Sequence, residues 1–516
     1  MGYNDNDAVV LKDFSFHYSA GHGDNTKEHH ITGLRKVNLR IQRGESVALV
    51  GASGCGKSSI LRAINGLIPH FHSGKLSGTV CVCGIDVAHE ELWKTGRVVS
   101  TVFQNPRTQF FTTDTTAELA FALENQSVEP AIIRARINEN TRRIGTHHLL
   151  DRNIFTLSGG EKQLIACTAS MVENPQVYLF DEPTSNLSAH AIDDFRHVLA
   201  ELRQRHATMV IAEHRLHFLR GLIDRVCIVD QGRIVEEMSV VQFFAMTDKQ
   251  AHQRGLRTLV SPKMRRVDCH LQPPPRGTIH SRLALSARNQ GDVRCDIDPS
   301  SGAPGLRLTN VQFSYEDHNV LHIDRAFFPS GKVCVLVGEN GAGKSTLAAA
   351  ICGLNNAKGH FVFTDTYEHR LRRRERRRLC YYVMQDVHRQ LFGASTQEEL
   401  LIGIHSAQRK DVQICQVLDD YGLLHEKDRH PMALSGGQKQ RLVIASAHIA
   451  RKKIYIFDEP SSGLDYRHLR TITQMLQRIA QKGNVVIVIT HDIELMNSCA
   501  DLIYCLHKQD TSASTH

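Results

Sequence analysis

Two glycine-rich stretches that each end in Lys-Ser are the segments of this sequence best suited to chemistry. One spans 51–58 and the other 338–345, and each follows a short apolar run typical of a buried strand. Glycines in such a loop let backbone N–H groups approach phosphate oxygens, and the lysine ammonium contacts the outer phosphates. The serine hydroxyl at the end of the loop suits Mg²⁺. The pattern predicts two sites for a nucleoside triphosphate, with Lys57 and Lys344 in equivalent roles.

Two acidic pairs supply a second element of the same chemistry. Asp181-Glu182 and Asp458-Glu459 each end an apolar, strand-like run and each precede a proline. An aspartate at the carboxyl end of a strand beside a phosphate loop can hold Mg²⁺ through water. The glutamate that follows can polarise an attacking water as a general base. Two surface acids at strand ends are the alternative, but the repeated Asp-Glu-Pro context favours a chemical role.

A Leu-Ser-Gly-Gly segment occurs at 157–160 and again at 434–437, and a helical pattern follows each one. A serine hydroxyl, glycine N–H groups and a helix N-terminus together attract anions. Alone, this segment would be an ordinary helix cap. In a chain that also has phosphate loops, it predicts a second anion site.

These motifs recur in the same order, which indicates an internal duplication. The phosphate loops lie 287 residues apart, whereas the Leu-Ser-Gly-Gly segments, the acidic pairs and two later histidines, His214 and His491, are each 277 residues apart. Loops can absorb the difference. We therefore predict two domains, at 7–245 and 304–510, joined by a linker at 246–303.

The charge of the chain is concentrated in this predicted linker. The 516 residues carry a net charge of +8, and 246–303 contains ten Lys and Arg against five Asp and Glu. The domains are then close to neutral, whereas a nucleic-acid partner would require a basic face on a folded domain, so none is expected. We interpret the linker, which has a proline run at 273–275, as a solvated tether. Contact with acidic lipid headgroups is the alternative.

Apolar runs in this sequence are strand-length, and none approaches the roughly 18 residues needed to cross a bilayer. The start of the sequence lacks the basic and hydrophobic segments of a signal peptide, so we expect a cytosolic chain whose membrane attachment comes from partners. Its 13 cysteines are scattered, which fits reduced thiols better than a disulfide framework. Cys81 and Cys83 lack a second ligand pair at zinc-site spacing, so a strand is the preferred interpretation.

Two further clusters have a plain interpretation and a functional alternative. The arginine-rich run at 372–378 is typical of a solvated face, with contact to a membrane surface as the alternative. His22, His29 and His30 lie in a polar stretch, and metal sensing is the alternative to a solvated loop.

In their order, the phosphate loop, the Leu-Ser-Gly-Gly segment, Asp-Glu-Pro and the late histidine resemble the ABC ATPase superfamily. The resemblance covers nearly the whole chain outside the linker. It implies an α/β fold of two tandem P-loop NTPase domains. Each domain would contain a RecA-like core, an antiparallel β subdomain and a helical subdomain that carries the Leu-Ser-Gly-Gly signature. It also implies ATP hydrolysis, with Mg²⁺ as cofactor.

The same resemblance implies two head-to-tail ATP sites, formed by an intramolecular domain pair in place of a homodimer. Lys57 would share one ATP with Ser435, and Lys344 would share the other with Ser158. The implied catalytic residues are Glu182, Glu459, His214, His491, Gln104 and Gln385. The implied ATP-binding residues are Tyr18, Gly51, Ser53, Gly54, Cys55, Gly56, Lys57, Ser58, Ser59, Ser158, Gly159, Gly160, Tyr315, Gly338, Asn340, Gly341, Ala342, Gly343, Lys344, Ser345, Thr346, Ser435, Gly436 and Gly437. The implied Mg²⁺ site consists of Ser58, Gln104, Asp181, Ser345, Gln385 and Asp458.

Family roles can be carried over to three kinds of side chain. The two histidines would contact the γ-phosphate. Tyr18 and Tyr315 would stack on adenine. Gln104 and Gln385 would form glutamine loops that sense Mg²⁺, the attacking water and a membrane partner.

The segments at 103–125 and 383–400, which contain these glutamines, resemble the ATPases of energy-coupling factor (ECF) importers in a fused two-domain form. So does the segment at 211–215. That resemblance implies an integral membrane coupling protein and a small membrane protein that captures a vitamin, a vitamin precursor or a metal ion. It implies a location at the cytoplasmic face of the cell membrane. The residues it places near the docking grooves of the coupling protein are Gln109, Phe110, Gln390 and Leu391. Packing inside the helical subdomain is the alternative for Phe110, Phe111, Leu391 and Phe392.

A soluble twin ABC protein, such as a ribosome-binding translation factor, is the main alternative function. It would favour a long charged helical linker and basic domains, which this sequence lacks. A fused ATPase of another importer class is the second alternative. The two copies also differ, because Ser188 stands where the second copy has Asp465. We expect both sites to hydrolyse ATP, and Ser188 favours unequal rates.

Overall fold

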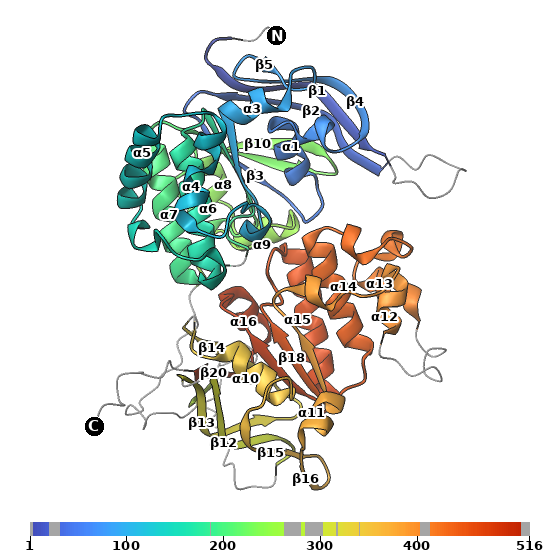
Figure 1. The fold of residues 1–516 in the computed structure, drawn as a ribbon. Coiled ribbons are helices and arrows are strands. Elements are labelled where there is room, and N and C mark those ends of the chain that lie inside the picture. Colours follow the sequence, from blue (N-terminus) through green and yellow to red (C-terminus); the bar gives the residue numbers. More distant parts are fainter. Residues whose placement is uncertain are drawn as a thin grey trace. The chain divides into compact units, whose positions relative to one another are not determined.

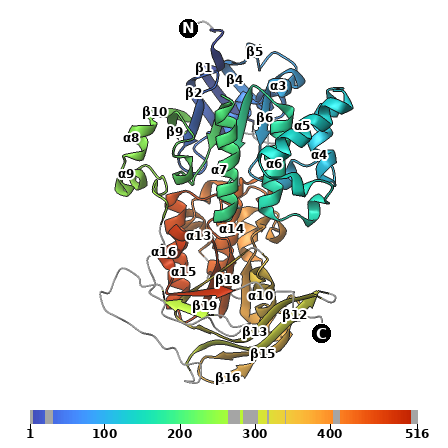
Figure 2. The same ribbon diagram turned by 90° about the vertical axis from the view of Figure 1, so that its left-hand side faces the viewer.

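The computed structural model describes residues 4–19, 31–185, 187–262, 280–283, 303–315, 318–339, 341–402 and 413–506. The chain forms two compact units with a boundary between Ser261 and Pro262. Each unit combines an antiparallel sheet, a mainly parallel sheet and a set of helices (Figures 1 and 2). The predicted α/β class and the tandem duplication are confirmed.

An antiparallel sheet forms one layer of the first unit. In spatial order its described strands are β2 (Ile31–Gln42), β1 (Asp7–Tyr18), β4 (Gly74–Val82) and β5 (Ile85–Asp86). Phe14 and Phe16 of β1 are fully buried, whereas Lys12 is exposed. This sheet therefore has one apolar face that must be covered.

A mainly parallel sheet forms the centre of the first unit. In spatial order its described strands are β10 (Arg233–Ser239), β9 (Arg225–Asp230), β3 (Ser46–Val50), β8 (Thr208–Ala212), β7 (Val177–Asp181) and β6 (Val99–Val102). Strand β10 is antiparallel to β9, and the remaining neighbours are parallel. Since parallel strands end at a common edge, Gly51, Glu182 and Glu213, which follow β3, β7 and β8, lie at that edge.

Helix α1 (Lys57–Ile64) packs between the two sheets of the first unit, because its Ile60 and Leu61 share one core with β1, β3 and β4. Helices α6 (Gly159–Glu173) and α7 (Ala189–Gln204) cover the opposite face of the parallel sheet. There Phe195 of α7 meets Phe180 of β7 edge-on, with ring centroids 5.6 Å apart. The phosphate loop is therefore held between a buried strand and a buried helix.

A helical group completes the first unit. Helices α4 (Thr115–Asn125) and α5 (Pro130–Arg143) pack on α6 around a small core that includes Leu119, Ile133 and Ile165. The shorter helices are α2 (Leu67–His70), α3 (Leu92–Val98), α8 (Val240–Phe244) and α9 (Asp248–Gln253). Short 3-10 turns lie at Pro106–Thr108, His147–Leu149, Ile154–Thr156 and His217–Leu219.

The second unit repeats this arrangement. Its described antiparallel strands are β13 (His318–Pro329), β12 (Gly305–Tyr315), β15 (Lys358–Thr364) and β16 (Glu368–Arg370). The described strands of its mainly parallel sheet are β11 (His280–Leu283), β20 (Leu502–Leu506), β14 (Val333–Gly338), β19 (Val485–Ile489), β18 (Ile454–Asp458) and β17 (Cys380–Val383). The edge strand β11 is antiparallel to its neighbour β20, as β10 is to β9.

Most of the described helices of the second unit have a counterpart in the first, and α16 (Ile493–Cys499) is the exception. The others are α10 (Lys344–Ile351), α11 (Arg373–Leu379), α12 (Thr396–Leu401), α13 (Ile414–Asp420), α14 (Gly436–Ile449) and α15 (Tyr466–Gln481). Its 3-10 turns lie at Val387–Gln390, Leu424–Glu426 and Pro431–Ala433. In the described parts of both units, no helix is long and apolar enough to cross a membrane.

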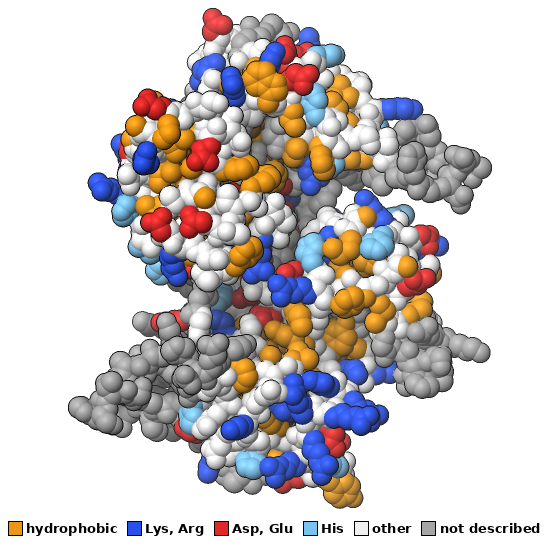
Figure 3. Space-filling model, viewed as in Figure 1, with side chains coloured by type: hydrophobic (Ala, Val, Ile, Leu, Met, Phe, Trp, Pro, Cys, Tyr) orange, Lys and Arg blue, Asp and Glu red, His pale blue; other side chains and the backbone are white. Residues whose placement is uncertain are grey.

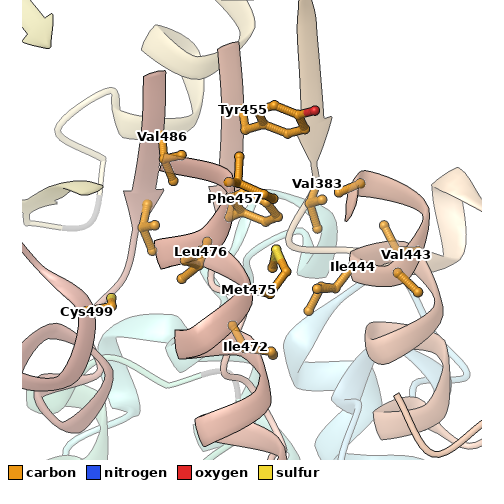
Figure 4. Close-up of a cluster of buried hydrophobic side chains, with 14 of the residues drawn as sticks. Val383, Val443, Ile444, Tyr455, Phe457, Ile472, Met475, Leu476, Val486 and Cys499 are labelled. Atoms are coloured by element: carbon orange, nitrogen blue, oxygen red, sulfur yellow. The ribbon is translucent and has the colours of Figure 1, made fainter. Parts of the chain in front are cut away.

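A large apolar cluster joins the parallel sheet of the second unit to α14 and α15 (Figure 4). Phe457 of β18 belongs to it, together with Ile444 of α14 and Met475 and Leu476 of α15. Apolar residues recur along α15 at helical spacing, which directs one face of the helix onto the sheet. This packing fixes β18, whose last residue is Asp458.

The linker predicted at 246–303 starts later than expected. Helix α9 lies inside that range, and Ala251, Leu256 and Leu259 are buried in the core of the first unit. Strand β11, also inside the range, pairs with β20 of the second unit. The composition of the segment hid these apolar anchors, because they are spaced too widely to form a long periodic run.

The arginine-rich run at 372–378 is only partly the solvated face that its composition suggests. Arg376 of α11 is buried, lies 3.8 Å from the ring centroid of Phe361 and donates to the Ala350 carbonyl at the end of α10. Arg373 and Arg377 each donate to the Gly353 carbonyl at 3.0 Å. These guanidinium groups satisfy carbonyls where α10 ends. Lys and Arg side chains also gather on the surface of this part of the second unit (Figure 3).

Candidate functional site

Both phosphate loops begin at a glycine that the fold requires. Gly51 has φ +155°, and a Cβ there would lie 2.2 Å from the Val229 carbonyl oxygen of β9. Gly338 has φ +157°, and a Cβ there would lie 2.3 Å from the Leu506 carbonyl oxygen of β20. A side chain at either position would therefore displace the loop from the neighbouring strand.

The lysine of each loop binds backbone carbonyls of its own loop. The Lys57 ammonium donates to the carbonyls of Gly51 at 3.0 Å and Ala52 at 3.1 Å. The Lys344 ammonium donates to the corresponding carbonyls of Gly338 at 2.7 Å and Glu339 at 2.9 Å. Both lysines are buried, and burial lowers the pKa of the Lys344 ammonium. Each lysine is thus positioned inside its loop, where a phosphate would bind.

A serine–aspartate pair lies next to each lysine. Ser58 Oγ donates to Asp181 Oδ1 at 2.8 Å, and Ser345 Oγ donates to Asp458 Oδ2 at 2.7 Å. Burial raises the pKa of the Asp181 carboxyl to about 6, and the neighbouring Glu182 charge adds to the effect. Burial also raises the pKa of Asp458. A divalent cation would remove the cost of keeping these buried carboxylates charged.

These pairs fit Mg²⁺ better than a metal held by protein alone. In the described residues, no group of three or more His, Cys, Asp and Glu side chains is arranged to hold a metal ion. Protein Mg²⁺ sites commonly use one or two carboxylates and complete the coordination with water and substrate phosphates. A carboxylate and a hydroxyl beside a phosphate loop match that requirement in both units.

The two candidate catalytic glutamates adopt the same unusual backbone conformation. Glu182 has φ +48° and Glu459 has φ +49°, the left-handed region that non-glycine residues rarely adopt. Each backbone N–H donates to a carbonyl of the neighbouring strand: that of Glu182 to Ala212 and that of Glu459 to Ile489, both at 2.8 Å. Such strain at equivalent positions of both copies is typical of a functional residue.

In the first unit, Glu182 lies in a compact cluster. Its two oxygens meet the Nε2 atoms of His214 at 3.0 Å and Gln104 at 2.9 Å. His214 Nε2 also lies 3.3 Å from the Lys57 ammonium. Burial acts to raise the pKa of the Glu182 carboxyl, but His214 and Lys57 outweigh it, and the net shift is downward. The cluster therefore favours an ionised carboxylate, as a general base requires.

In the second unit, the corresponding groups are further apart. His491 Nε2 lies 4.0 Å from Glu459 Oε1, and the Thr490 hydroxyl donates to the other carboxylate oxygen at 3.1 Å. Gln385 is exposed. Tyr382 donates from its phenol to Asp458 Oδ2 at 3.0 Å. The residue types predicted from the motifs are present, but their contacts differ from those in the first unit.

The Leu-Ser-Gly-Gly segments start α6 and α14 with the same capping arrangement. Ser158 Oγ accepts from the N–H of Glu161 at 3.3 Å, and Ser435 Oγ accepts from the N–H of Gln438 at 3.4 Å. The side chains of Glu161 and Gln438 accept in return from the serine N–H groups. A hydroxyl that accepts such a bond still has its hydrogen to donate, so capping is compatible with binding an anion.

The remaining predicted ATP contacts are only partly placed. Tyr18 lies in the first unit, where its hydroxyl hydrogen-bonds to Ser59 Oγ at 2.9 Å. Its ring leaves no space for a Cβ at Gly33, which would come within 2.5 Å of it. Asn340 lies outside the described residues, as do His22, His29, His30 and the side chain of Tyr315. Ser53, Gly54, Cys55, Gly56, Gly341, Ala342, Gly343 and Thr346 lie in or directly after the phosphate loops.

The residues expected near the docking grooves of a coupling protein make contacts within their own unit. Gln109 Oε1 accepts from the Phe103 N–H at 3.2 Å, and Gln390 Oε1 accepts from the Met384 N–H at 2.8 Å, so both glutamines brace their own loops. Phe110 is partly buried against two cores and Leu391 is buried. The packing alternative describes these two residues.

The next residue in each loop, Phe111 or Phe392, is instead exposed. Their exposed fractions are 76% and 77%. A buried glutamate supports each loop: Glu118 accepts from the Phe111 N–H at 3.0 Å, and Glu399 accepts from the Phe392 N–H at 2.8 Å. From the sequence, both phenylalanines were interpreted only as packing residues. Exposure of a single loop position produces no periodic pattern, so it could not be predicted.

Comparisons with known proteins identify the family of this chain. The sequence profile described as "ABC transporter" matches residues 34–185 and 325–462. A "Putative ABC transporter ATP-binding protein" of Treponema denticola is 36% identical over 499 residues, which cover 96% of this chain and 95% of that protein. The "Putative HMP/thiamine import ATP-binding protein YkoD" of Bacillus subtilis is 30% identical over 481 residues, or 92% of this chain and 86% of that protein.

A solved structure entitled "Model of ribosome-bound archaeal Pelota and ABCE1" matches 96% of this chain and 76% of its own, with a TM-score of 0.61. Sequence identity there is 18%, so the likeness concerns the fold. The family profile occurs once in each unit, and the relatives span both units. The chain belongs to the ABC transporter family of ATP-binding proteins and is a tandem ATPase.

Proposed function

We propose that this chain is the ATPase subunit of an ECF-type importer for a vitamin, a vitamin precursor or a metal ion. The duplicated site carries the proposal, because each unit has a phosphate loop, an acidic pair, a signature helix and an exposed phenylalanine beside its glutamine loop. The relative named as an HMP/thiamine import protein supports the importer class. The protein would act at the cytoplasmic face of a membrane.

In the proposed reaction, the residues of each unit have distinct tasks. Lys57 leaves its loop carbonyls to contact the outer phosphates of ATP. Glu182 accepts a proton from the attacking water, and His214 contacts the γ-phosphate. Bound Mg²⁺, held by Ser58 and Asp181, would neutralise charge on the phosphates. Lys344, Ser345, Asp458, Glu459 and His491 perform the same tasks in the second unit.

We further propose, from the family resemblance, that each ATP needs both copies. The signature serine of one copy would donate to the phosphates bound by the other, so Ser435 serves Lys57 and Ser158 serves Lys344. Ser435→Arg should then abolish hydrolysis by the site of Lys57, although the substitution lies in the other half of the chain.

Phe111 and Phe392 are the side chains that we propose for contact with the coupling protein. Each is an exposed aromatic ring on a loop braced by a buried glutamate, so burying it against a partner costs little ordering. The loops also carry Gln104 and Gln385, which would connect the partner to the ATP sites. This proposal adds to the expectation, from the family resemblance, that Gln109, Phe110, Gln390 and Leu391 lie near the docking grooves.

Purification from native membranes in detergent, followed by mass spectrometry, tests this function. We expect an integral coupling protein and a small membrane protein to accompany the tagged chain. Phe111→Asp with Phe392→Asp should lose both partners but keep basal ATP hydrolysis. Val241→Asp, at a residue with an exposed fraction of 81% on α8, is the matched control and should keep them.

The translation-factor alternative makes the opposite prediction. The observation behind this alternative is a likeness in fold to a structure entitled as a model of a ribosome-bound ABC protein. Recovery of ribosomes without an integral membrane protein would contradict the importer proposal. Recovery of a membrane permease of a different architecture would favour another importer class.

A further inference from the structure

The order of charged residues around the two histidines differs between the copies. The first reads Glu213-His214-Arg215, whereas the second reads Thr490-His491-Asp492. The histidines themselves are 277 residues apart, the same spacing as the acidic pairs. The carboxylate therefore precedes the histidine in one copy and follows it in the other.

Glu213 joins two segments of the first site. Its Oε1 accepts from both the N–H and the hydroxyl of Thr184, two residues after the catalytic glutamate. Its Oε2 accepts from the N–H of His214 at 2.6 Å and from the N–H of Arg215 at 3.4 Å. The side chain is 2% exposed. One buried carboxylate thus holds the histidine loop against the segment that follows Glu182.

Asp492 makes the corresponding connection in the second site from the other side of the histidine. Its Oδ2 accepts from the hydroxyl of Ser461, the counterpart of Thr184, at 2.7 Å. Its Oδ1 accepts from the N–H groups of Glu494 and Leu495, and so caps α16. Thr490, the counterpart of Glu213, donates to Glu459 instead.

The changed order also accounts for a local difference in fold. Arg215 cannot accept hydrogen bonds from a helix N-terminus, so it cannot cap a helix as Asp492 does. Its guanidinium donates to the Leu187 carbonyl at 3.1 Å, and the chain continues into the short turn at His217–Leu219. In the second copy the capped helix α16 follows directly.

We propose that Glu213 is a positioning residue of the first ATP site, which sets the distance between His214 and Glu182. This inference rests on the proposed hydrolytic roles of those two residues. Both oxygens of Glu213 are occupied by Thr184 and the histidine loop, so it acts through His214 rather than on water. With this support, His214 approaches Glu182 to 3.0 Å, whereas His491 lies 4.0 Å from Glu459.

A site-resolved hydrolysis assay tests the role of Glu213. The full-length chain is loaded with labelled ATP without Mg²⁺ and separated from free nucleotide, and hydrolysis is then started with Mg²⁺ and excess unlabelled ATP. The part of the phosphate release that is lost in Glu182→Gln is assigned to the first site. In Glu213→Gln, phosphate from the first site should appear about 10-fold more slowly, and phosphate from the second site should appear at an unchanged rate.

A double variant that carries the residue order of the second copy around His214 tests for rescue. Glu213→Thr alone should slow the first site as Glu213→Gln does. Glu213→Thr combined with Arg215→Asp recreates the order of the second copy, in which the histidine lies 4.0 Å from its glutamate, and should recover part of the lost rate. Asp492→Asn is the matched control, which should slow the second site and spare the first. A folding defect would instead reduce the amount of ATP loaded at both sites and lower the melting temperature.

The outcomes separate this inference from the proposed function. An unchanged first-site rate in Glu213→Gln, or a double variant no faster than Glu213→Thr, would overturn the positioning role. Full turnover in Glu182→Gln would instead overturn the proposed catalytic base. Neither result can be mistaken for the other, because they concern different variants in one assay.

Discussion

The two catalytic glutamates share a backbone conformation but not their neighbours. Glu182 meets His214 at 3.0 Å and Gln104 at 2.9 Å, whereas Glu459 has Thr490 at 3.1 Å and His491 at 4.0 Å. The strand that precedes each glutamate and the strand beside it are equivalent, so the shared geometry comes from the sheet. The differences come from single residues around it, which shows that duplication preserved the scaffold and changed the contacts.

A second contrast lies at the aspartates that pair with the phosphate-loop serines. Tyr382 of β17 donates to Asp458, whereas the corresponding position in the first copy is Thr101, whose hydroxyl accepts from Asn65 at 3.1 Å. Ser188, which replaces the expected aspartate, accepts from the N–H of Ala191 at the start of α7. Both differences lie at positions where the two copies carry different residues, so each site can be adjusted independently.

Replacing the catalytic glutamates should have the largest effect. Glu182→Gln and Glu459→Gln each remove a proton acceptor, and hydrolysis at the site of the substituted glutamate should fall by about 100-fold or more. Because the clusters differ, we expect unequal residual rates. Glu368→Gln, at an exposed glutamate paired with Arg307, should remain within about 2-fold of the unmodified chain. Wild-type turnover in either glutamine variant would refute the base assignment.

A partly buried acid in the first unit predicts a pH-dependent difference in stability. Burial raises the pKa of Glu173 at the end of α6 from the ordinary 4.5 to about 7, against the opposing effect of a hydrogen bond with Ser100. The folded state therefore favours the neutral acid, and its stabilisation is complete below pH 4.5 and lost as pH rises through 7. Glu173→Gln should stabilise the first unit at pH 8 by at most about 3 kcal/mol.

The second unit provides the comparison for that measurement, since Ala450 occupies the position of Glu173. Urea unfolding at pH 5 and pH 8 should show a gain for Glu173→Gln that is larger at pH 8 and confined to the transition of the first unit. An equal gain at both pH values would mean that Glu173 does not titrate in this range.

The smallest expected effect concerns the phenol at Asp458. Tyr382→Phe removes one hydrogen bond to a buried carboxylate and should lower the free energy of unfolding of the second unit by about 1–3 kcal/mol. Thr101→Val, at the corresponding position of the first copy, removes no bond to Asp181 and is the matched comparison. Denaturant unfolding measures both. If both variants lost the same free energy of unfolding, the hydrogen bond from Tyr382 to Asp458 would not distinguish the two sites.

Much of the fold followed from the sequence, because the motifs occur at strand–helix junctions with fixed geometry. The apolar runs before Gly51 and Asp181 predicted two strands, which lie in the same sheet, and the duplication predicted the second unit. The buried anchors Leu256 and Leu259 were missed, since scattered apolar residues in a polar segment have no period. Arg376 was missed because a charge run does not reveal which member is buried.

The limits at the site have a similar origin. The motifs named Glu182 and His214, but their separation depends on Glu213, which the sequence singled out only as part of the segment 211–215 and without a role. Exposure of Phe111 and Phe392 also depends on loop conformation, which is set by the buried carboxylates Glu118 and Glu399. Spacing along a chain predicts which groups meet at an edge of a sheet, whereas distances depend on packing around them.

A single round of hydrolysis by the unmodified chain tests the inequality of the two sites most directly. The chain is loaded with labelled ATP, freed of unbound nucleotide, and mixed with Mg²⁺ and excess unlabelled ATP in a rapid-quench instrument. If the sites differ in their glutamate clusters as described, phosphate should appear in two phases of about one phosphate per chain each, with different rates. A single phase with an amplitude of about two phosphates per chain would contradict unequal sites.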